Sequence, residues 1–463
     1  MEIIMKKYLI FLMSVVLVFC LSGCNDDGSN NTPSTSNKKN TGITTVPSEN
    51  DMPVDETKDG KKTLVVSILG VNDFYKQAKQ KYEEMYPNTT IQFKEFPTEG
   101  ATMSQAEVER YIKQTTTEVL SGKGADLFVT NSDLPIEKFI NKQAFVNLDE
   151  LIKKDNTFDT NLYQMNILDN SRMNQGLYIL PLTFYLQALY GDAASIESAG
   201  VIVDDEKWSW TQFAEISKQL AGKGGHTYSM GNWPPDLLIN NLVSDNYAKL
   251  INGRTASFDS AFFKDLLKQV KSLYDDKVIK AENVDYKDSN FAYSMITSPS
   301  DYLVRLKLYY KDGKVYQKPH SSEQKSGISF EVVNQIAMNA NSKVKGEAWN
   351  FMKFLMSEEM QSYPQQTGFS INKSVNEKVI NDLAEKGKLD DPKGGVVPIA
   401  EKDLDAIREM VNKASLRDIG FNNPNNKIQT ILSEEVKAFF SGQKTAEDVA
   451  KLIQNRVMTY LNE

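Results

Sequence analysis

The sequence predicts an α/β fold with two domains, on the strength of two observations. The first is that strand-like and helix-like segments alternate. Residues 64–69 form a short apolar run, residues 74–85 repeat apolar side chains at helical spacing, and residues 91–96 alternate like a second strand. A polar helix over residues 105–120 and a buried strand over residues 126–130 follow, and this order is typical of a sheet with helices on both faces. The second observation is length, because 463 residues exceed what one small core accommodates.

The later segments continue the alternation and end in helices. We expect strands over residues 176–182, 291–296 and 332–337, and helices over residues 262–274, 348–356, 428–439 and 445–461. Another helix starts near Trp210, with Ser209 or Thr211 as its N-cap. In an α/β sheet a ligand binds outside the carboxyl ends of the strands, which points to Asn72 and Asp73 after the first strand and to residues 131–133 after the third.

The first residues indicate export. Lys6 and Lys7 precede an apolar run over residues 8–21, which is shorter than the ~20 residues of a membrane span. The residues that end at Cys24, Leu-Ser-Gly-Cys, resemble the lipobox of bacterial lipoproteins. The resemblance implies a signal peptide over residues 1–23, a lipid on Cys24 and a location at the extracytoplasmic face of the cell membrane. An uncleaved membrane anchor is the alternative.

Composition separates a tether from a body and excludes several kinds of chemistry. Residues 24–61 are polar and almost free of large apolar side chains, so we expect a flexible tether. The two cysteines, Cys20 and Cys24, lie near the start, and the two histidines, His226 and His320, are far apart in the sequence. We therefore expect no disulfide, metal site or cofactor in the body. A net charge of −8 argues against nucleic-acid binding.

Catalytic motifs are largely absent. The body contains no nucleophile elbow, zinc-protease motif or phosphate-binding loop. Carboxylates are plentiful, but no particular pair indicates a glycosidase. We therefore expect a binding protein rather than an enzyme.

The order of segments resembles the family 1 extracellular solute-binding proteins of ABC importers, which include maltose-binding proteins. The similarity is carried by residues 64–66 with the helix that ends at Tyr86-Pro87, and by residues 125–128, 145–149, 176–190, 209–213 and 348–368. Two departures are Tyr190-Gly191-Asp192, where the family often has Tyr-Asn, and residues 368–371, which lack the family's proline.

The resemblance implies a two-lobe, class II periplasmic-binding-protein-like fold, in which each lobe is a sheet flanked by helices and the ligand cleft lies at the hinge. The first lobe is expected over residues 62–181 and 294–338, and the second over residues 182–293 and 339–463. It also implies that the protein is a monomer, that the lobes close on a ligand, and that the permease subunits of an ABC transporter recognise the closed form.

The resemblance further implies a set of ligand-binding residues. Sugars need flat aromatic rings for their apolar faces and carboxylates or amides for their hydroxyl groups. At the matching positions stand Asp133, Tyr185, Trp233, Asp301, Tyr302, Phe330 and Glu331. Trp233 lies in a proline-rich loop, which favours exposure, whereas Asp133 could equally cap the following helix. Trp210 and Trp349 are expected in the core.

The solute is less well defined than the fold. Thr130 and Ser300 occupy positions where maltose-type relatives carry tryptophans, which suggests a ligand other than a linear maltodextrin. We expect a small solute, foremost a mono- or oligosaccharide. Alternatives are a peptide or polyamine as the ligand, a sensor that presents its ligand to a surface receptor, and, last, a surface glycosidase.

Overall fold

The computed structural model describes residues 52–462, apart from residues 57–59, 99–102, 132, 221–222, 224, 311–312, 321–326, 365–366, 391–394 and 419–426. Cys24, the expected signal peptide and most of the expected tether therefore lie outside the described residues.

A ten-stranded sheet runs through the protein. Its main strands are, in spatial order, β2 (Thr89–Glu95), β1 (Lys62–Ile68), β3 (Leu127–Thr130), β10 (Ile328–Met338), β4 (Ile179–Asp192), β8 (Ser289–Ile296) and β5 (Tyr228–Met230). Three short strands pair outside this order: β9 (Gly313–Tyr316) and β11 (Phe369–Ser370) with β4, and β14 (Ala414–Asp418) with β10. The strands at both ends pair in parallel, whereas β10 is antiparallel to β3 and β4, and β4 is antiparallel to β8. The predicted α/β class is confirmed, and the long strands β4, β8 and β10, here called the crossing strands, join the two ends into one sheet.

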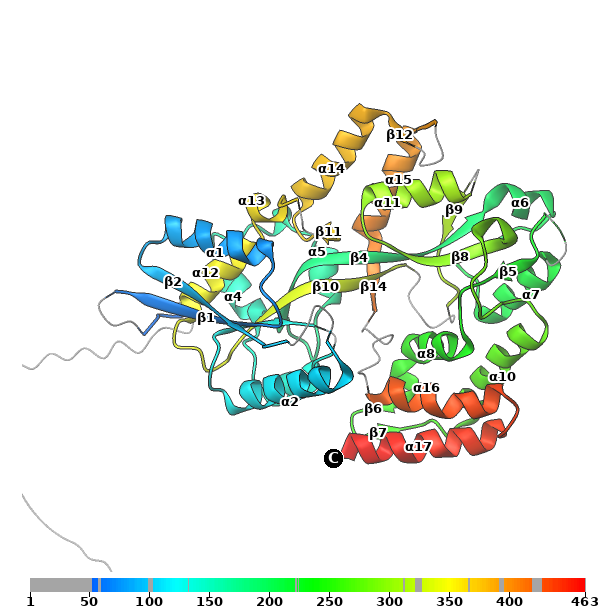
Figure 1. Cartoon of the computed structure of the whole chain (residues 1–463), viewed down its shortest axis with the longest axis horizontal. Helices are drawn as coiled ribbons and strands as arrows, with labels where there is room; N and C mark the ends of the chain where they lie inside the picture. Colours follow the sequence, from blue (N-terminus) through cyan, green and yellow to red (C-terminus); the bar gives the residue numbers. More distant parts are fainter. Residues whose placement is uncertain are drawn as a thin grey trace, which may run out of the picture. The chain divides into compact units, whose positions relative to one another are not determined.

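One face of the sheet, here called the apolar face, is covered along its whole length. On the crossing strands Phe184, Leu186, Tyr190 and Ile336 point to this side and are buried, and they share one core with Leu64 of β1. This large core is closed by helices that lie above the sheet in Figure 1. They are α1 (Asp73–Met85), α11 (Pro299–Val304), α12 (Lys345–Leu355), α13 (Glu358–Gln361), α14 (Lys373–Lys386) and α15 (Glu401–Lys413).

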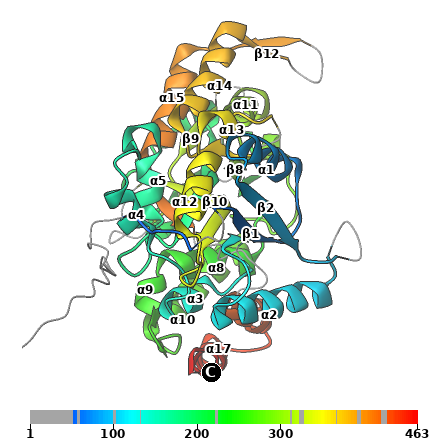
Figure 2. The same cartoon turned by 90° about the vertical axis from the view of Figure 1, so that its left-hand side faces the viewer.

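The opposite face, here called the mixed face, is covered only at its two ends. At one end α2 (Gln105–Ser121) and α3 (Ile136–Asn141) close a small core that includes Phe128 and Ala337. At the other end Leu189 and Phe291 belong to a separate core. That core is formed with α7 (Trp210–Leu220), α8 (Pro235–Asp245), α10 (Ala261–Asp275), α16 (Lys427–Phe440) and α17 (Ala446–Asn462). The helices α2, α8, α10, α16 and α17 lie below the sheet in Figure 1, and Figure 2 shows α3 beside α2.

Local sequence explains where the main helices begin and end. Ser104 and Glu107 form a capping box at the start of α2, and Gly122 ends the helix in the left-handed conformation. Ser260 caps α10 through the amide of Phe263. The remaining elements are α4 (Leu148–Lys154), η1 (Thr160–Leu162), α5 (Met165–Asn170), α6 (Ala193–Ser198), α9 (Tyr247–Leu250), β6 (Ile251–Asn252), β7 (Thr255–Ala256), η2 (Tyr286–Asp288), the π-helical turn η3 (Arg305–Tyr309), β12 (Lys388–Asp390) and β13 (Val396–Pro398).

The cores show which segments pack together, whereas the expected lobe boundaries stay a prediction. Residues from Val344 to Ala414 pack in the large core with residues of β1 and of β4. The helices α16 and α17 pack with α7, α8 and α10. No pattern within α12 or α15 says which end of the sheet its apolar side will cover, so this contact was not predictable from the helices alone.

The end of the expected tether is fixed to the body. The Asp55 carboxylate accepts hydrogen bonds from the amides of Gly346, at 2.7 Å, and Glu347, at 3.1 Å, at the start of α12. It also pairs with Lys62 at 2.8 Å. Residues 52–56 thus belong to the folded body, and the expectation of a flexible segment up to residue 61 is wrong for them. In the part of the chain that the structure describes, every helix is too short or too polar to cross a membrane.

Candidate functional site

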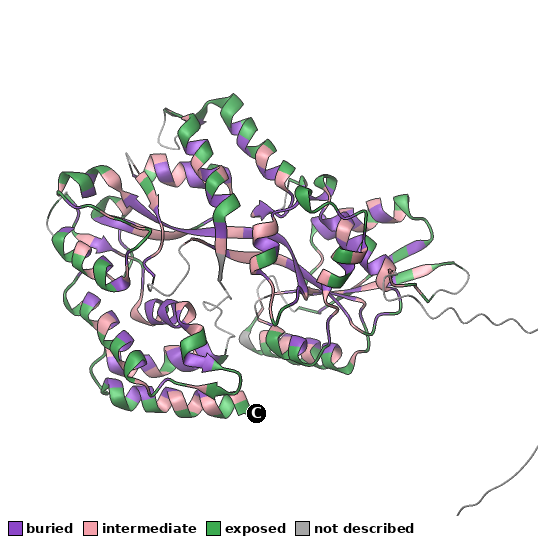
Figure 3. Cartoon of the chain, turned by 180° about the vertical axis from the view of Figure 1, so that it is seen from behind, coloured by how far each residue is buried: buried purple, intermediate pink, exposed green. Residues whose placement is uncertain are grey.

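The middle of the mixed face carries a strip of mostly polar side chains between the two apolar ends. Strand register sets which side chains share this strip: Glu331 lies opposite Tyr185, Gln187 lies opposite both Met295 and Ser329, and Gln335 lies opposite Thr130. Figure 3 shows buried and half-buried residues mixed along the crossing strands. We call the strip the polar band, and it consists of Thr130, Thr183, Tyr185, Gln187, Tyr293, Met295, Ser329, Glu331, Asn334 and Gln335.

Hydrogen bonds link the centre of the band across all three crossing strands. The Tyr293 hydroxyl donates to Oε1 of Gln187 at 2.5 Å, and Nε2 of Gln187 donates to the Glu331 carboxylate at 3.5 Å. Nearby, Nδ2 of Asn334 donates to the Thr183 hydroxyl at 2.9 Å. The Glu331 carboxylate is an acceptor only, and its two oxygens can accept several hydrogen bonds. The centre of the band can therefore orient a ligand that donates hydrogen bonds.

An aromatic stack supports one end of this chain of hydrogen bonds. The rings of Trp233 and Tyr293 are parallel within 2°, with centroids 5.0 Å apart, and Trp210 meets Trp233 edge-on at 5.4 Å. The loop that holds Trp233 contains Asn232 at a positive φ of 60°, and Oδ1 of Asn232 accepts from the amide of Val284 at 2.9 Å. Trp233 is therefore held rigidly behind Tyr293.

The expectation that Trp233 is exposed is wrong. Its side chain is 5% exposed, and one face is covered by Tyr293. The half-buried ring on the band is Tyr293 itself. The proline-rich loop indicated a surface position, but the stack with Tyr293 and Trp210 turns the indole into the core around α17.

Tyr185 supplies a second half-buried ring, on β4. Gly368 lies against it with a φ of +97°, and a Cβ there would come within 2.9 Å of the Phe184 carbonyl oxygen and 3.3 Å of the Tyr185 ring. A side chain at residue 368 would therefore both strain the backbone and displace Tyr185.

Asp133 lies beyond Thr130 at the α2 end of the band. Its amide donates to Oδ1 of Asn131 at 3.2 Å, and Nδ2 of Asn131 donates to its carboxylate at 3.3 Å. Burial raises the pKa of the Tyr111 phenol on α2, and the Asp133 charge adds to that rise. The alternative of a helix cap is not supported, because α3 has Pro135 as its N-cap and no side-chain cap.

Five of the nine predicted ligand-binding residues lie away from the band. Phe330 is 0% exposed and packs against Phe184 on the apolar face, and Tyr302 is 3% exposed in the same core. Asp301 accepts from Nε of Arg305 at 2.9 Å at the start of α11, which covers that face. Asn72 caps α1 through the amide of Tyr75, and Asp73 pairs with Lys76 at 3.1 Å. These five residues have structural contacts away from the band, so the candidate site does not include them, and their part in ligand binding stays a prediction.

Sequence reasoning missed most of the band. Gln187, Tyr293, Asn334 and Gln335 were not singled out as site residues. The usable signal is the alternation in residues 183–188, where polar or aromatic residues at odd positions separate apolar residues at even positions.

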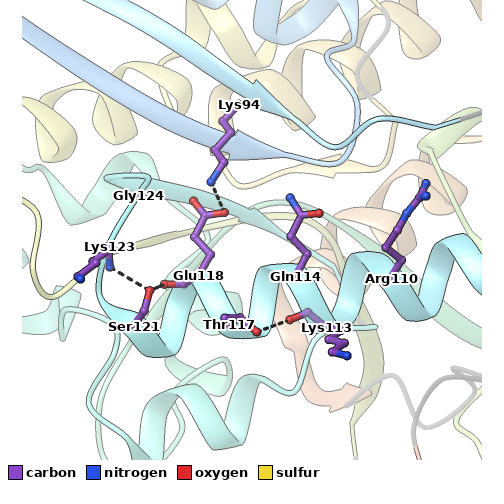
Figure 4. Close-up of a pocket in the computed structure, with 9 residues that line it drawn as sticks. All are labelled: Lys94, Arg110, Lys113, Gln114, Thr117, Glu118, Ser121, Lys123 and Gly124. Carbon is purple, nitrogen blue, oxygen red and sulfur yellow. Dashed lines mark hydrogen bonds and ion pairs between the residues drawn. The ribbon is translucent and has the colours of Figure 1, made fainter.

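A surface hollow of about 550 Å³ lies elsewhere, between α2 and β2 (Figure 4). Lys94 pairs there with Glu118 at 2.6 Å, and Arg110 lies over the Phe96 ring at 5.4 Å. Its other basic side chains are Lys113 and Lys123. The hollow shares no residue with the band, so we do not count it in the site.

Residues 70–362 match the family model described as bacterial extracellular solute-binding protein. This match covers more than half of the chain.

Solved structures of low sequence identity share the fold. A sugar transporter from Rhizobium etli, in an open conformation, has 16% identity and a TM-score of 0.55, over 85% of this chain and 98% of its own. A family 1 extracellular solute-binding protein from Alicyclobacillus acidocaldarius has 16% identity and a TM-score of 0.57, over 87% and 98%. An ABC substrate-binding protein from Listeria monocytogenes, in complex with cycloalternan, has 13% identity and a TM-score of 0.54, over 87% and 99%.

Proposed function

The chain belongs to the bacterial extracellular solute-binding proteins, and from that premise we propose that it binds a small carbohydrate on the polar band and delivers it to an ABC importer. The observation that carries this proposal is the hydrogen-bonded chain Tyr293–Gln187–Glu331 beside the ring of Tyr185. Because the chain belongs to a family of extracellular proteins, its location is outside the cytoplasm.

The chemistry of the band suits an uncharged polyhydroxylated ligand. Tyrosine rings can cover an apolar sugar face, and amide and carboxylate oxygens accept from hydroxyl groups. The residues of the band include no lysine or arginine, the side chains that bind anionic ligands most strongly. The Rhizobium protein is called a sugar transporter and the Listeria protein was solved with cycloalternan, and both names support a carbohydrate here.

We propose binding without hydrolysis. A glycosidase needs two carboxyl groups on opposite sides of the bond that it cleaves, about 5–9.5 Å apart. Among the described residues of the band, Glu331 supplies the carboxylate, and it is engaged by Gln187. Incubation with oligosaccharides should therefore release no reducing sugar.

The crossing strands supply the hinge of the proposed mechanism. Each contributes side chains to the band. The strand β4 enters the cores at both ends of the sheet, whereas β8 and β10 each enter the core at one end. A rotation of the two ends about these strands would close both ends on a ligand. We further propose that the lipid on Cys24 anchors the protein to the extracytoplasmic face of the membrane, with residues 25–51 as the tether.

A thermal-shift screen tests the carbohydrate assignment. A ligand that binds only the native state at about 100 times its Kd stabilises the protein by about 2.7 kcal/mol and raises the melting temperature. The panel contains glucose, galactose, cellobiose, xylotriose and maltotriose, with a tripeptide mixture and spermidine for comparison. We expect a shift from at least one sugar. If every sugar fails while the peptides or spermidine shift the protein, the carbohydrate assignment is refuted.

A pair of variants places the ligand on the band. Tyr293→Phe removes the hydroxyl that donates to Gln187, whereas Tyr309→Phe removes a hydroxyl from an exposed ring that stacks on Tyr286, away from the band. The sugar-induced shift should shrink in the first variant and persist in the second. Equal shifts in both would exclude the band as the binding site.

A further inference from the structure

Two polar atoms at the α2 end of the band are buried without a hydrogen-bond partner. They are Oγ1 of Thr130 and Oε1 of Gln335. Thr130 is 3% exposed and Gln335 is 6% exposed, and the two residues lie directly opposite each other on β3 and β10. Nearly all buried polar groups in proteins are hydrogen-bonded, so a neighbouring pair of unpaired atoms indicates that something else supplies the bonds.

Strand register fixes the face on which both side chains lie. Thr130 follows Val129, which packs against the large core, and Gln335 precedes Ile336, which belongs to that core. Side chains alternate along a strand, so Thr130 and Gln335 point to the mixed face. Gln335 also lies opposite Pro181 on β4, two residues from Thr183 of the band. The unpaired atoms thus adjoin the hydrogen-bonded part of the band.

We propose that Thr130 and Gln335 form a subsite that takes one hydroxyl group of the ligand, an inference that rests on the band being the binding site. Oε1 of Gln335 can only accept, whereas the Thr130 hydroxyl can donate and accept. A ligand hydroxyl that donates to Gln335 and accepts from Thr130 satisfies both atoms at once. The subsite therefore selects a ligand with a hydroxyl group at this end and rejects the corresponding deoxy compound.

The subsite favours a ligand that has a hydroxyl group at this position over the analogue that lacks it. A site that is built to bind a hydroxyl group leaves its own buried polar atoms unpaired when that group is missing, and this penalty makes rejection of the analogue strong. An aromatic side chain at residue 130 would offer a ring face, whereas Thr130 offers a hydrogen bond. Recognition at this end of the band thus depends on hydroxyl position.

The test compares isosteric variants of the full chain. Thr130→Val and Gln335→Met remove the polar atoms and keep the approximate side-chain size. Thr116→Val is the matched control, because Thr116 on α2 also has a buried hydroxyl without a partner but lies outside the band. The probe is the compound of the panel above that shifts the wild-type protein most. Its Kd is measured by calorimetry, and the melting temperature of each ligand-free variant is recorded.

We expect Thr130→Val and Gln335→Met to raise the Kd about 5- to 100-fold, the range expected when a buried polar group is left without its hydrogen-bond partner. Thr116→Val should keep it within twofold. The ligand-free melting temperature of Thr130→Val should be no lower than that of Thr116→Val, because neither loses a bond within the protein. A Kd within twofold of wild type in Thr130→Val overturns the subsite. The subsite is also overturned if Thr130→Val and Gln335→Met, but not Thr116→Val, lower the melting temperature of the ligand-free protein. An internal water would then supply the hydrogen bonds to both unpaired atoms.

The outcomes separate the subsite from the carbohydrate assignment. If only the peptides or spermidine bind, the carbohydrate assignment falls, and the same variants measured with that compound decide the subsite. If a sugar binds and Thr130→Val binds it equally well, the subsite falls and the assignment stands. If no compound of the panel shifts the wild-type protein, both are overturned.

Discussion

Glu347 ties α12 to three elements that lie more than 250 residues earlier in the sequence, and its replacement should measure how much that network stabilises the fold. Its carboxylate accepts from Nζ of Lys62 at 2.8 Å, from the Tyr82 hydroxyl at 2.7 Å and from the Thr89 hydroxyl at 2.9 Å. The Glu347 side chain is 6% exposed. Lys62 also reaches Asp55, so the network ties the end of the tether to β1, α1, β2 and α12.

The variant Glu347→Gln keeps the shape of the side chain and removes the charge. A hydrogen bond to a charged group contributes about 1.5–3 kcal/mol and a neutral bond about 0.5–1.5 kcal/mol, so each of the three bonds loses about 1 kcal/mol. Lys62 is 28% exposed and keeps Asp55, which lessens the loss at that bond. We therefore expect the free energy of unfolding to fall by about 2–3 kcal/mol at neutral pH.

The loss should depend on pH in a defined direction. Burial alone would raise the pKa of Glu347, but the bonds from Lys62, Tyr82 and Thr89 outweigh it and lower the pKa below its usual range. A carboxyl whose pKa is lower in the folded state stabilises the fold above its unfolded pKa of about 4.3, and that contribution is lost as pH falls through the folded pKa. The difference between Glu347→Gln and wild type should therefore be complete at pH 7 and shrink below about pH 4.

Urea unfolding followed by tryptophan fluorescence, at about pH 7 and about pH 3.5, measures the effect. Glu359→Gln is the control, because Glu359 is half exposed and pairs with Lys81 at the surface. An exposed pair contributes about 0–1 kcal/mol, so we expect little change from it. Equal losses in the two variants, or a Glu347→Gln loss that persists undiminished at the lower pH, would refute the reasoning.

Two further variants examine contacts that the sequence did not reveal. Trp233→Ala should lower the free energy of unfolding by about 3–5 kcal/mol in urea, because the indole is buried between Tyr293 and Trp210. A loss below about 1 kcal/mol would mean that the stack does not form. Glu83 accepts from the amide of Ile91 at 2.7 Å on the outer edge of β2, and Glu83→Ala should leave that edge open to pairing with a second copy. Sedimentation velocity should show that Glu83→Ala associates increasingly as the protein concentration rises. The control Glu84→Ala changes an exposed neighbouring residue and should sediment like the wild-type protein. If the two variants sediment alike, Glu83 does not protect the edge of β2.

The fold class was predictable because it depends on periodicity. The alternation of short apolar runs with helical spacing determined a sheet covered by helices, and the structure confirms it. Packing between distant segments was not predictable in the same way. The apolar sides of α12 and α16 look equivalent in sequence, yet α12 packs beside β1 and α16 beside α17.

The predicted residues and the candidate site overlap in part, and the differences have a common cause. Tyr185, which the family pattern places after a crossing strand, and Glu331, which it places before the last one, lie opposite each other on the band. Phe330 and Glu331, however, are consecutive residues of one strand, so they point to opposite faces and cannot both contact the ligand. Position along the chain indicated which strand segments lie near the band. The alternation of side chains along each strand decides whether a residue points to the face with the polar band or to the face with the large core.

The location of the band on the crossing strands connects recognition with the proposed closure. Tyr293, Gln187 and Glu331 belong to three different strands, and each hydrogen bond between them spans a strand boundary. A ligand that bridges these groups would restrain the twist of the strands relative to one another. The strand β4 enters the cores at both ends of the sheet, whereas β8 enters the core that contains Phe291 and β10 the core that contains Ala337. A ligand can shift a conformational equilibrium only by its difference in affinity for the two states. Side chains on the crossing strands provide such a difference directly, because any rotation of the two ends changes the distances among the groups that the ligand contacts.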